Sequence, residues 1–361
     1  MLDSERGNTP ERHSTTGAAP APDAAGSATG GSNGRDEGLV ALLVMAYGTP
    51  QSLDQVEPYY THIRHGRPPT PELLQELIER YKAIGGKSPL HEITEEQARQ
   101  VARRVADRLG RPVEAFVGYL HIAPFIADAV ERLVAARPQD AVGLVLAPQY
   151  SEASVALYHR AARDALARHP EAPAVRFIDH FHNHPGFIAA LARRVEQTLA
   201  ALPADRREGA VVVFTAHSIP QPVVDRGDPY PRHVGETAAR VAAAAGLGRW
   251  RVAYQSAGRT ADPWLGPDVT DVIRELGREG VRAVVACPVG FVADHLEVLY
   301  DLDIEARQVA EEAGLAFART PSLNADADFV EVLADLVLDR LGATRHEAAA
   351  AGARPEGPEG S

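Results

Sequence analysis

Eight short apolar runs recur along the sequence, and this alternation constrains the fold more than any other feature. Longer stretches with the 3.6-residue period of amphipathic helices separate the runs. Near-continuous apolar runs that alternate with helices are typical of parallel strands covered on both faces. We therefore predict eight parallel strands, over residues 39–46, 113–117, 141–147, 175–178, 210–215, 251–254, 281–287 and 315–318.

A helix predicted over residues 187–202 separates the first four strands from the last four. The sequence thus predicts an α/β protein with two similar doubly wound, Rossmann-like halves, each a four-stranded parallel sheet, and a cleft between them. We expect the halves to span 38–205 and 206–322, and a closing helix within 323–344 to pack on one of them. The flanks, 1–37 and 345–361, are rich in Gly, Ala, Pro and charge, which predicts disorder.

Composition excludes several classes of protein. The chain carries 37 basic and 49 acidic residues, so its net charge of −12 argues against nucleic acid or an anionic membrane as the main partner. The single cysteine, Cys287, excludes an intrachain disulfide and a cysteine-ligated [2Fe–2S] cluster. The longest apolar stretch, 39–46, is too short to span a bilayer, and no apolar signal segment is visible. We expect a cytoplasmic protein.

Two common nucleotide-binding motifs are incomplete. Gly85-Gly86-Lys87-Ser88 resembles the end of a P-loop, but Tyr81 stands where the first glycine belongs. After the first strand, Gly48-Thr49-Pro50 replaces the glycine-rich turn of dinucleotide-binding proteins.

The clearest constellation joins a histidine with a row of carboxylates. His217 follows the fifth apolar run, and Glu297, Asp301 and Glu305 stand at four-residue intervals on a helix predicted to begin near Asp294. In open α/β sheets, ligands bind beyond the carboxyl ends of the strands. A histidine there exchanges protons near neutral pH, and an oxygen-rich row passes a divalent cation without trapping it as thiolates would. The alternatives are a structural histidine and an acidic helix N-terminus with a solvated face.

Three further residues are candidates for the same site at the carboxyl ends of the strands. Tyr47 follows the first strand, and Arg64 and Arg80 carry planar guanidinium groups that match carboxylates. The alternative for Tyr47 is packing under the following turn, which is equally compatible with the sequence. The alternative for each arginine is an ordinary surface position.

His180, His182 and His184 alternate, so a strand would place all three imidazoles on one face. That pattern allows a metal site. A polar strand end running into Pro185-Gly186 is the favoured interpretation, because no second ligand cluster accompanies it.

Six blocks of the sequence together resemble the ferrochelatase family. They are L-L-V-M-A-Y-G-T-P, Y-Y-T-H-I-R-H-G-R, R-Y-K-A-I-G-G-K-S-P-L, T-A-H-S-I-P, D-P-W-L-G-P-D-V and G-F-V-A-D-H-L-E-V-L-Y-D. The blocks occur in the family's order and cover essentially all of the chain between the two flanks. The resemblance is strongest to the bacterial branch that acts on coproporphyrin III.

This resemblance implies roles for individual residues. His217 and Glu297 match the pair that handles metal and accepts protons, and Asp301 and Glu305 match an acidic relay. Tyr47 matches a tyrosine axial to the product iron that distinguishes the coproporphyrin branch. The positions implied to hold the porphyrin and its propionates also include Arg64, Arg80, Tyr81, Ser88, Tyr158, His121 and, more weakly, Ser154.

The implied reaction is insertion of Fe²⁺ into coproporphyrin III with release of two pyrrole protons, in haem biosynthesis. Fe²⁺ is then a substrate, and no prosthetic group is expected. The alternatives are a protoporphyrin IX ferrochelatase, another tetrapyrrole metal chelatase, or a haem-binding carrier. We expect a monomer whose only macromolecular partners are neighbouring enzymes of the haem pathway, in transient contact.

Overall fold

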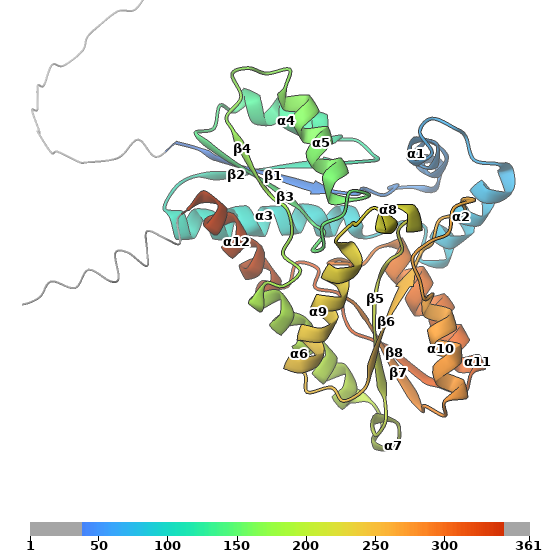
Figure 1. Cartoon of the computed structure of the whole chain (residues 1–361). Helices are drawn as coiled ribbons and strands as arrows, with labels where there is room; N and C mark the ends of the chain where they lie inside the picture. Colours follow the sequence, from blue (N-terminus) through green and yellow to red (C-terminus); the bar gives the residue numbers. More distant parts are fainter. Residues whose placement is uncertain (1–37, 343–361) are drawn as a thin grey trace, which may run out of the picture. The chain divides into compact units, whose positions relative to one another are not determined.

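The eight apolar runs form eight strands in two parallel four-stranded sheets of identical strand order (Figure 1). The computed structural model describes residues 38–342, so the flanks predicted to be disordered, 1–37 and 345–361, lie outside the described residues. The first sheet has the order β2 (Val113–Tyr119), β1 (Val40–Ala46), β3 (Asp140–Val145) and β4 (Val175–Ile178). The second has the order β6 (Trp250–Gln255), β5 (Val211–His217), β7 (Ala283–Pro288) and β8 (Ala316–Arg319). The predicted fold class is confirmed.

Helices cover both faces of the first sheet. One face packs against α4 (Ile126–Ala135) and α5 (Val155–Leu166). The other packs against α3 (Leu90–Leu109) and α12 (Ala327–Leu341). Full coverage explains why β1 is buried along its whole length and reads as an unbroken apolar run.

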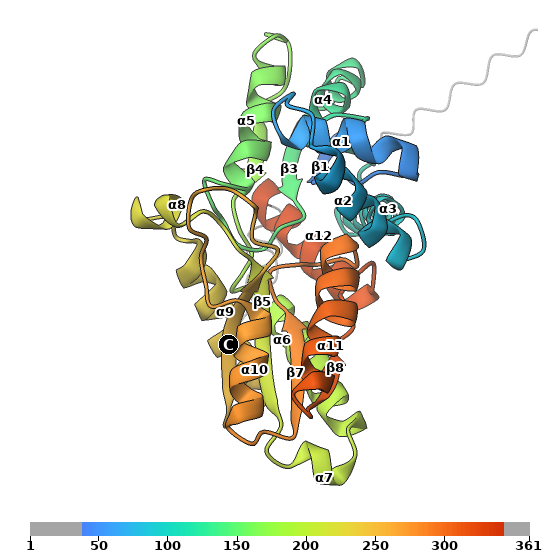
Figure 2. The ribbon, with the colours of Figure 1, turned by 90° about the vertical axis from the view of Figure 1, so that its right-hand side faces the viewer.

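The second sheet is covered in the same way (Figure 2). One face packs against α6 (Pro185–Ala201) and α9 (Tyr230–Ala244), and the other against α10 (Val269–Arg278) and α11 (Arg307–Glu312). Immediately before α11 lies η2 (Val298–Ala306), a π-helix.

The largest core cluster is shared between the sheets. It contains Leu42 and Leu144 of the first sheet, Phe214 and Val285 of the second, and side chains of α3, α6, α9 and α12. The predicted closing helix is α12, and it packs on α3, α6, β3 and β4, which assigns it to the first sheet. The predicted division between residues 205 and 206 stays a prediction.

Four short helices and one longer helix complete the described part of the chain, residues 38–342. Between β1 and α3 lie η1 (Leu53–Gln55), α1 (Val56–Ile63) and α2 (Pro71–Ala83), and flanking β5 are α7 (Ala204–Arg207) and α8 (Gln221–Asp225). Val56 and Tyr81 of α1 and α2 pack against Leu296, just before η2. This contact brings the segment after the first strand onto the helix that carries the predicted carboxylate row. Within residues 38–342, no helix has the length and apolar character needed to cross a membrane.

Candidate active site

His217 ends β5, and the surrounding backbone fixes its position. Its Nδ1 donates a short hydrogen bond to the Ser218 carbonyl, and its own carbonyl accepts one from the Tyr230 hydroxyl at 2.9 Å. Gly290 passes so close that a Cβ there would lie 2.6 Å from the Cβ of Ala216. Only glycine permits this approach, so the loop after β7 lies directly against the end of β5.

Glu297 faces the other nitrogen of His217. The distance from His217 Nε2 to Glu297 Oε1 is 3.5 Å, and His295 Nε2 lies 3.6 Å from Oε2. Burial alone would lower the pKa of His217, but the charge and contact of Glu297, together with the Ser218 carbonyl, raise it to about 9. Burial also opposes ionisation of Glu297, yet the two histidines hold the pKa of this carboxyl well below its usual range.

Two consequences follow from this pairing. At neutral pH, His217 and Glu297 form an imidazolium–carboxylate pair. The expectation that His217 exchanges protons near neutral pH, as an ordinary histidine does, is therefore wrong for the folded protein.

The carboxylate row lies on a π-helix rather than on the α-helix that its spacing predicted. In η2 the hydrogen bonds run from i to i+5, so the turn is wider than in an α-helix. Glu297 is half-buried, Asp301 is 4% exposed and Glu305 is exposed. The row therefore leads from His217 through a buried carboxyl to the surface.

Asp301 is the most constrained member of the row. Its Oδ1 accepts a hydrogen bond from Arg80 Nη1 at 3.2 Å, and its Oδ2 accepts one from the Ser256 hydroxyl. Burial and the nearby charge of Glu297 raise the pKa of Asp301 to about 6, against the opposing effects of Ser256 and Arg80.

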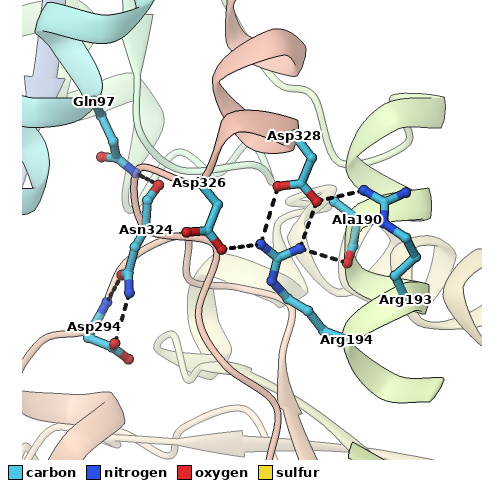
Figure 3. A network of polar contacts seen from close by, with 8 residues as sticks. All are labelled: Gln97, Ala190, Arg193, Arg194, Asp294, Asn324, Asp326 and Asp328. Carbon is cyan, nitrogen blue, oxygen red and sulfur yellow. Dashed lines mark hydrogen bonds and ion pairs between the residues drawn. The ribbon is translucent and has the colours of Figure 1, made fainter. Parts of the chain in front are cut away.

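A polar network anchors the chain just before η2 (Figure 3). The Asn324 side chain bonds both the backbone N–H and the carboxylate of Asp294, at 2.8 and 3.0 Å. The Asn324 carbonyl accepts a hydrogen bond from Gln97 of α3 at 2.7 Å. Arg319 extends the network, since it contacts Asp294 at 3.3 Å and holds Asp303 of η2 through two hydrogen bonds of 2.8 Å. The start of the carboxylate-bearing helix is thus tied to the first half of the molecule.

Tyr47 occupies the corresponding edge of the first sheet. It follows β1, and Gly48 takes φ +83° where a Cβ would lie 2.6 Å from Ile122. The Tyr47 ring contacts those of Tyr59 and His121, with centroids 6.5 and 4.5 Å apart. Burial and the charge of Glu297 raise the pKa of Tyr47, so its phenol is neutral at physiological pH and within electrostatic reach of Glu297.

Tyr81 and Tyr158 are almost fully buried near Tyr47. Burial is the main reason that the pKa of each phenol is raised, and Tyr47 and Glu297 contribute to both shifts. These two predicted residues are therefore brought together with the site.

His121 lies against the Tyr47 ring, and its Nδ1 is 3.0 Å from the Nδ1 of His62. Burial, with the neighbouring His62 and His65, lowers the pKa of His121 to about 4. It is neutral at physiological pH, in contrast to His217.

The other predicted porphyrin residues are more scattered. Arg64 follows α1 and stacks over Tyr60, with 5.7 Å from its guanidinium carbon to the ring centroid. Ser88 is fully buried and accepts a hydrogen bond from the Leu90 N–H, so it stabilises the start of α3. Ser154 occupies the N-cap position of α5 without a side-chain capping bond. The structure does not place Ser88 at an exposed surface of the site.

The histidine triplet does not lie on a strand. β4 ends at Ile178, and the following turn carries His182 onto His233 of α9, with parallel rings 3.8 Å apart. His184 accepts a hydrogen bond from the Gly186 N–H at the start of α6. Between residues 38 and 342, no group of three or more His, Cys, Asp or Glu side chains is arranged to hold a metal ion. The one-face geometry considered for a metal site is therefore wrong.

Four site residues escaped the sequence reasoning. His295, Tyr230, Ser256 and Asn324 contact Glu297, His217, Asp301 and Asp294, respectively. His295 stands two positions before Glu297, and that proximity was a usable signal. The other three come from distant parts of the chain, so spacing alone cannot connect them to the site.

The family model and the curated relatives agree on one family. The ferrochelatase family model matches residues 39–341. The coproporphyrin III ferrochelatase of Geobacillus kaustophilus is 47% identical over 311 residues, which cover 85% of this chain and 98% of the relative. The enzyme of the same name from Bacillus subtilis is 43% identical over 307 residues, covering 84% and 98%. Among solved structures, SirB from Bacillus subtilis with Fe³⁺ shares the fold, with a TM-score of 0.53 at 12% identity over 85% of this chain and 97% of SirB.

Proposed function

The chain belongs to the ferrochelatase family, and we propose that it inserts Fe²⁺ into coproporphyrin III to form coproheme in haem biosynthesis. Two pyrrole protons leave as the metal enters. The similarity to curated coproporphyrin III ferrochelatases over most of the chain supports the choice of ring. The observation that carries the chemistry is the His217–Glu297 pair, with the neutral phenol of Tyr47 within electrostatic reach of Glu297.

His217 and Glu297 act together on protons and metal. Because the pair already holds a proton at neutral pH, His217 must first pass that proton toward solvent, along Asp301 and Glu305, as a divalent cation arrives beside Glu297. The free imidazole Nε2 is then the base for a pyrrole N–H, and each pyrrole proton leaves by the same route before the next is accepted, with Glu297 oriented by His295. Asp301 and Glu305 lead protons or metal between this pair and the surface.

The first half of the molecule holds the ring. Tyr47 faces the metal from the opposite side and is axial to the iron of the product. Tyr81, Tyr158 and His121 surround it, while the guanidinium groups of Arg64 and Arg80 attract the propionates. Ser88 contributes by stabilising the start of α3, whereas the Ser154 side chain, which makes no capping bond, contributes as a hydrogen-bonding group for the ring.

Fe²⁺ is a substrate in this proposal, and the protein uses no prosthetic group. Cys287 is buried in β7, and burial raises the pKa of its thiol to about 12, so it remains a thiol. We further propose that the protein works in the cytoplasm as a monomer, which passes its product on by transient contact with the next enzyme.

Anaerobic Fe²⁺ insertion, followed by absorbance with coproporphyrin III and protoporphyrin IX in parallel, tests the proposal. We expect a strong preference for coproporphyrin III. Preference for protoporphyrin IX would keep the chelatase and overturn the choice of ring. Binding of either ring without faster insertion would instead support a haem carrier, and insertion of another metal alone would support a different chelatase.

A further inference from the structure

Arg80 and Asp301 form an ion pair at the point where the first half meets the carboxylate row. Arg80 comes from α2 and Asp301 from η2, and their contact at 3.2 Å bridges 221 positions of the sequence. The Asp301 side chain is 5% exposed and that of Arg80 is 28% exposed. Asp301 thus has a cation in direct contact, at a position where the proposed function needs its charge for a passing metal ion.

The guanidinium of Arg80 is only partly used by this contact. Among residues 38–342, its one hydrogen-bond acceptor is Asp301, although a guanidinium carries five N–H donors. Glu76 lies 3.8 Å away, and Tyr300 supports the planar group from one side, with 4.7 Å to the ring centroid. Arg80 is therefore held in place by stacking while most of its donors stay open to another carboxylate.

We propose that Arg80 is an exchangeable counter-ion, which passes from Asp301 to a carboxylate of the ring when the ring binds. An incoming propionate competes with Asp301 for Arg80, because both are carboxylates and a guanidinium prefers bidentate contact. Once Arg80 turns to the ring, Asp301 loses this neighbouring cation, and its Oδ1 is open to a divalent cation, which displaces any proton that the carboxyl has taken up. Arg80 thereby couples ring binding to the opening of the metal route.

This inference rests on the proposed function for the identity of the ring, but its physical content is a competition between two carboxylates. Such a competition has a thermodynamic signature. Removing Asp301 frees Arg80 and strengthens ring binding, whereas removing Asp301 has no effect when Arg80 is already absent.

The test measures the affinity for metal-free coproporphyrin III, by quenching of its fluorescence, in wild type, Asp301→Asn, Arg80→Gln and the double variant. We expect Asp301→Asn to bind the ring about fivefold tighter and Arg80→Gln about tenfold weaker, the scale of one charged contact. The double variant should match Arg80→Gln. Arg259→Gln, which removes a neighbouring contact with Glu76 but leaves Arg80 on Asp301, should stay within about twofold of wild type.

A second measurement needs no ring. Co²⁺ binding, followed by calorimetry in the absence of porphyrin, should be about tenfold tighter in Arg80→Gln than in wild type, because the competing cation is gone. Arg80→Lys, which keeps the charge, should remain close to wild type, and the gain should vanish in the double variant.

The outcomes separate this inference from the proposed function. If wild type does not bind coproporphyrin III, the proposed function fails, and the Co²⁺ measurement still decides on the ion pair. If Asp301→Asn weakens ring binding, if its effect persists without Arg80, or if Arg80→Gln leaves Co²⁺ affinity unchanged, Arg80 is not an exchangeable counter-ion.

Discussion

The two sheets have the same topology and present opposite chemistry at the same edge. β1 and β5 occupy equivalent places in the orders β2-β1-β3-β4 and β6-β5-β7-β8. β1 leads into Tyr47, whose neighbours Tyr81, Tyr158 and His121 are neutral at physiological pH. β5 ends in His217, which forms a charged pair with Glu297.

In both halves the topology fixes where the residues at this edge lie, whereas their local partners decide whether each side chain is charged. Burial disfavours the charged form of a histidine in both halves. His121 meets other histidines and its pKa falls, whereas His217 meets a carboxylate and its pKa rises. A macrocycle between the two edges would have a neutral aromatic surface on one side and a proton-holding pair on the other.

The largest expected effect comes from removing the charged side. His217→Ala should slow Fe²⁺ insertion by about 10²–10⁴-fold, because the proposed proton acceptor is lost. Coproporphyrin III binding should change little, since the first half supplies the ring-holding residues. Insertion is measured by anaerobic absorbance and binding by fluorescence quenching. Loss of both activities together would make His217 a binding or folding residue.

The second prediction concerns the charge that distinguishes His217 from His121. Glu297→Gln should lower the pKa of His217 from about 9 toward the ordinary value near 6.5, so that at pH 8 the imidazole is neutral in the variant and charged in wild type. NMR titration of the His217 ring measures this change directly.

The same pairing predicts a pH-dependent stability. The folded pKa of His217 is raised, so its contribution is fully present below the unfolded pKa and is lost as pH rises through about 9. Thermal unfolding between pH 6.5 and 9.5 should show this loss in wild type and not in Glu297→Gln. Equal slopes in the two proteins would contradict the pairing.

A smaller effect on the insertion rate is expected from Tyr47, which is neutral. Tyr47→Phe should reduce the insertion rate by less than about tenfold, because a phenol with a raised pKa does not serve as the proton acceptor. The absorbance spectrum of the iron-loaded product should nevertheless change, since the proposed axial oxygen is absent. Tyr59→Phe, a change of the same size on a neighbouring ring, should leave that spectrum unaltered.

The last test concerns histidines outside the site. Burial and neighbouring His182, His180 and Arg232 lower the pKa of His233 to about 4. A histidine held neutral contributes stability above its unfolded pKa near 6.5, and this contribution is lost as pH falls toward 4. Between pH 7.5 and pH 5, His233→Gln should therefore lose about 2 kcal/mol less stability than wild type. Denaturant unfolding at pH 7.5 and pH 5 measures the difference.

The elements of the fold were accessible from the sequence because burial on both faces leaves a strong signal. Each predicted strand overlaps an observed one, since parallel strands such as β1 and β7 need apolar side chains on every residue. The π-helix was not accessible, because Glu297, Asp301 and Glu305 at four-residue spacing suit an α-helix equally well. In the folded chain, Arg319 hydrogen-bonds Asp303 within this helix, and Asn324 hydrogen-bonds Asp294 just before it.

The site was only partly accessible for a similar reason. His217 and Glu297 are recognisable by residue type and by their place after strands. The pKa of His217 and the engagement of Asp301 by Arg80 are properties of contacts between residues far apart in the chain. Residue spacing carries no information about such contacts.

The position of α12 has a consequence for the order in which the protein is made. This helix ends at Leu341, yet it covers β3, β4 and α3, which belong to the first part of the chain. While a ribosome is still synthesising the second sheet, the apolar face of the first sheet lacks that cover. The half that is translated first is therefore completed last, and a nascent chain must keep this surface from premature association until α12 has emerged.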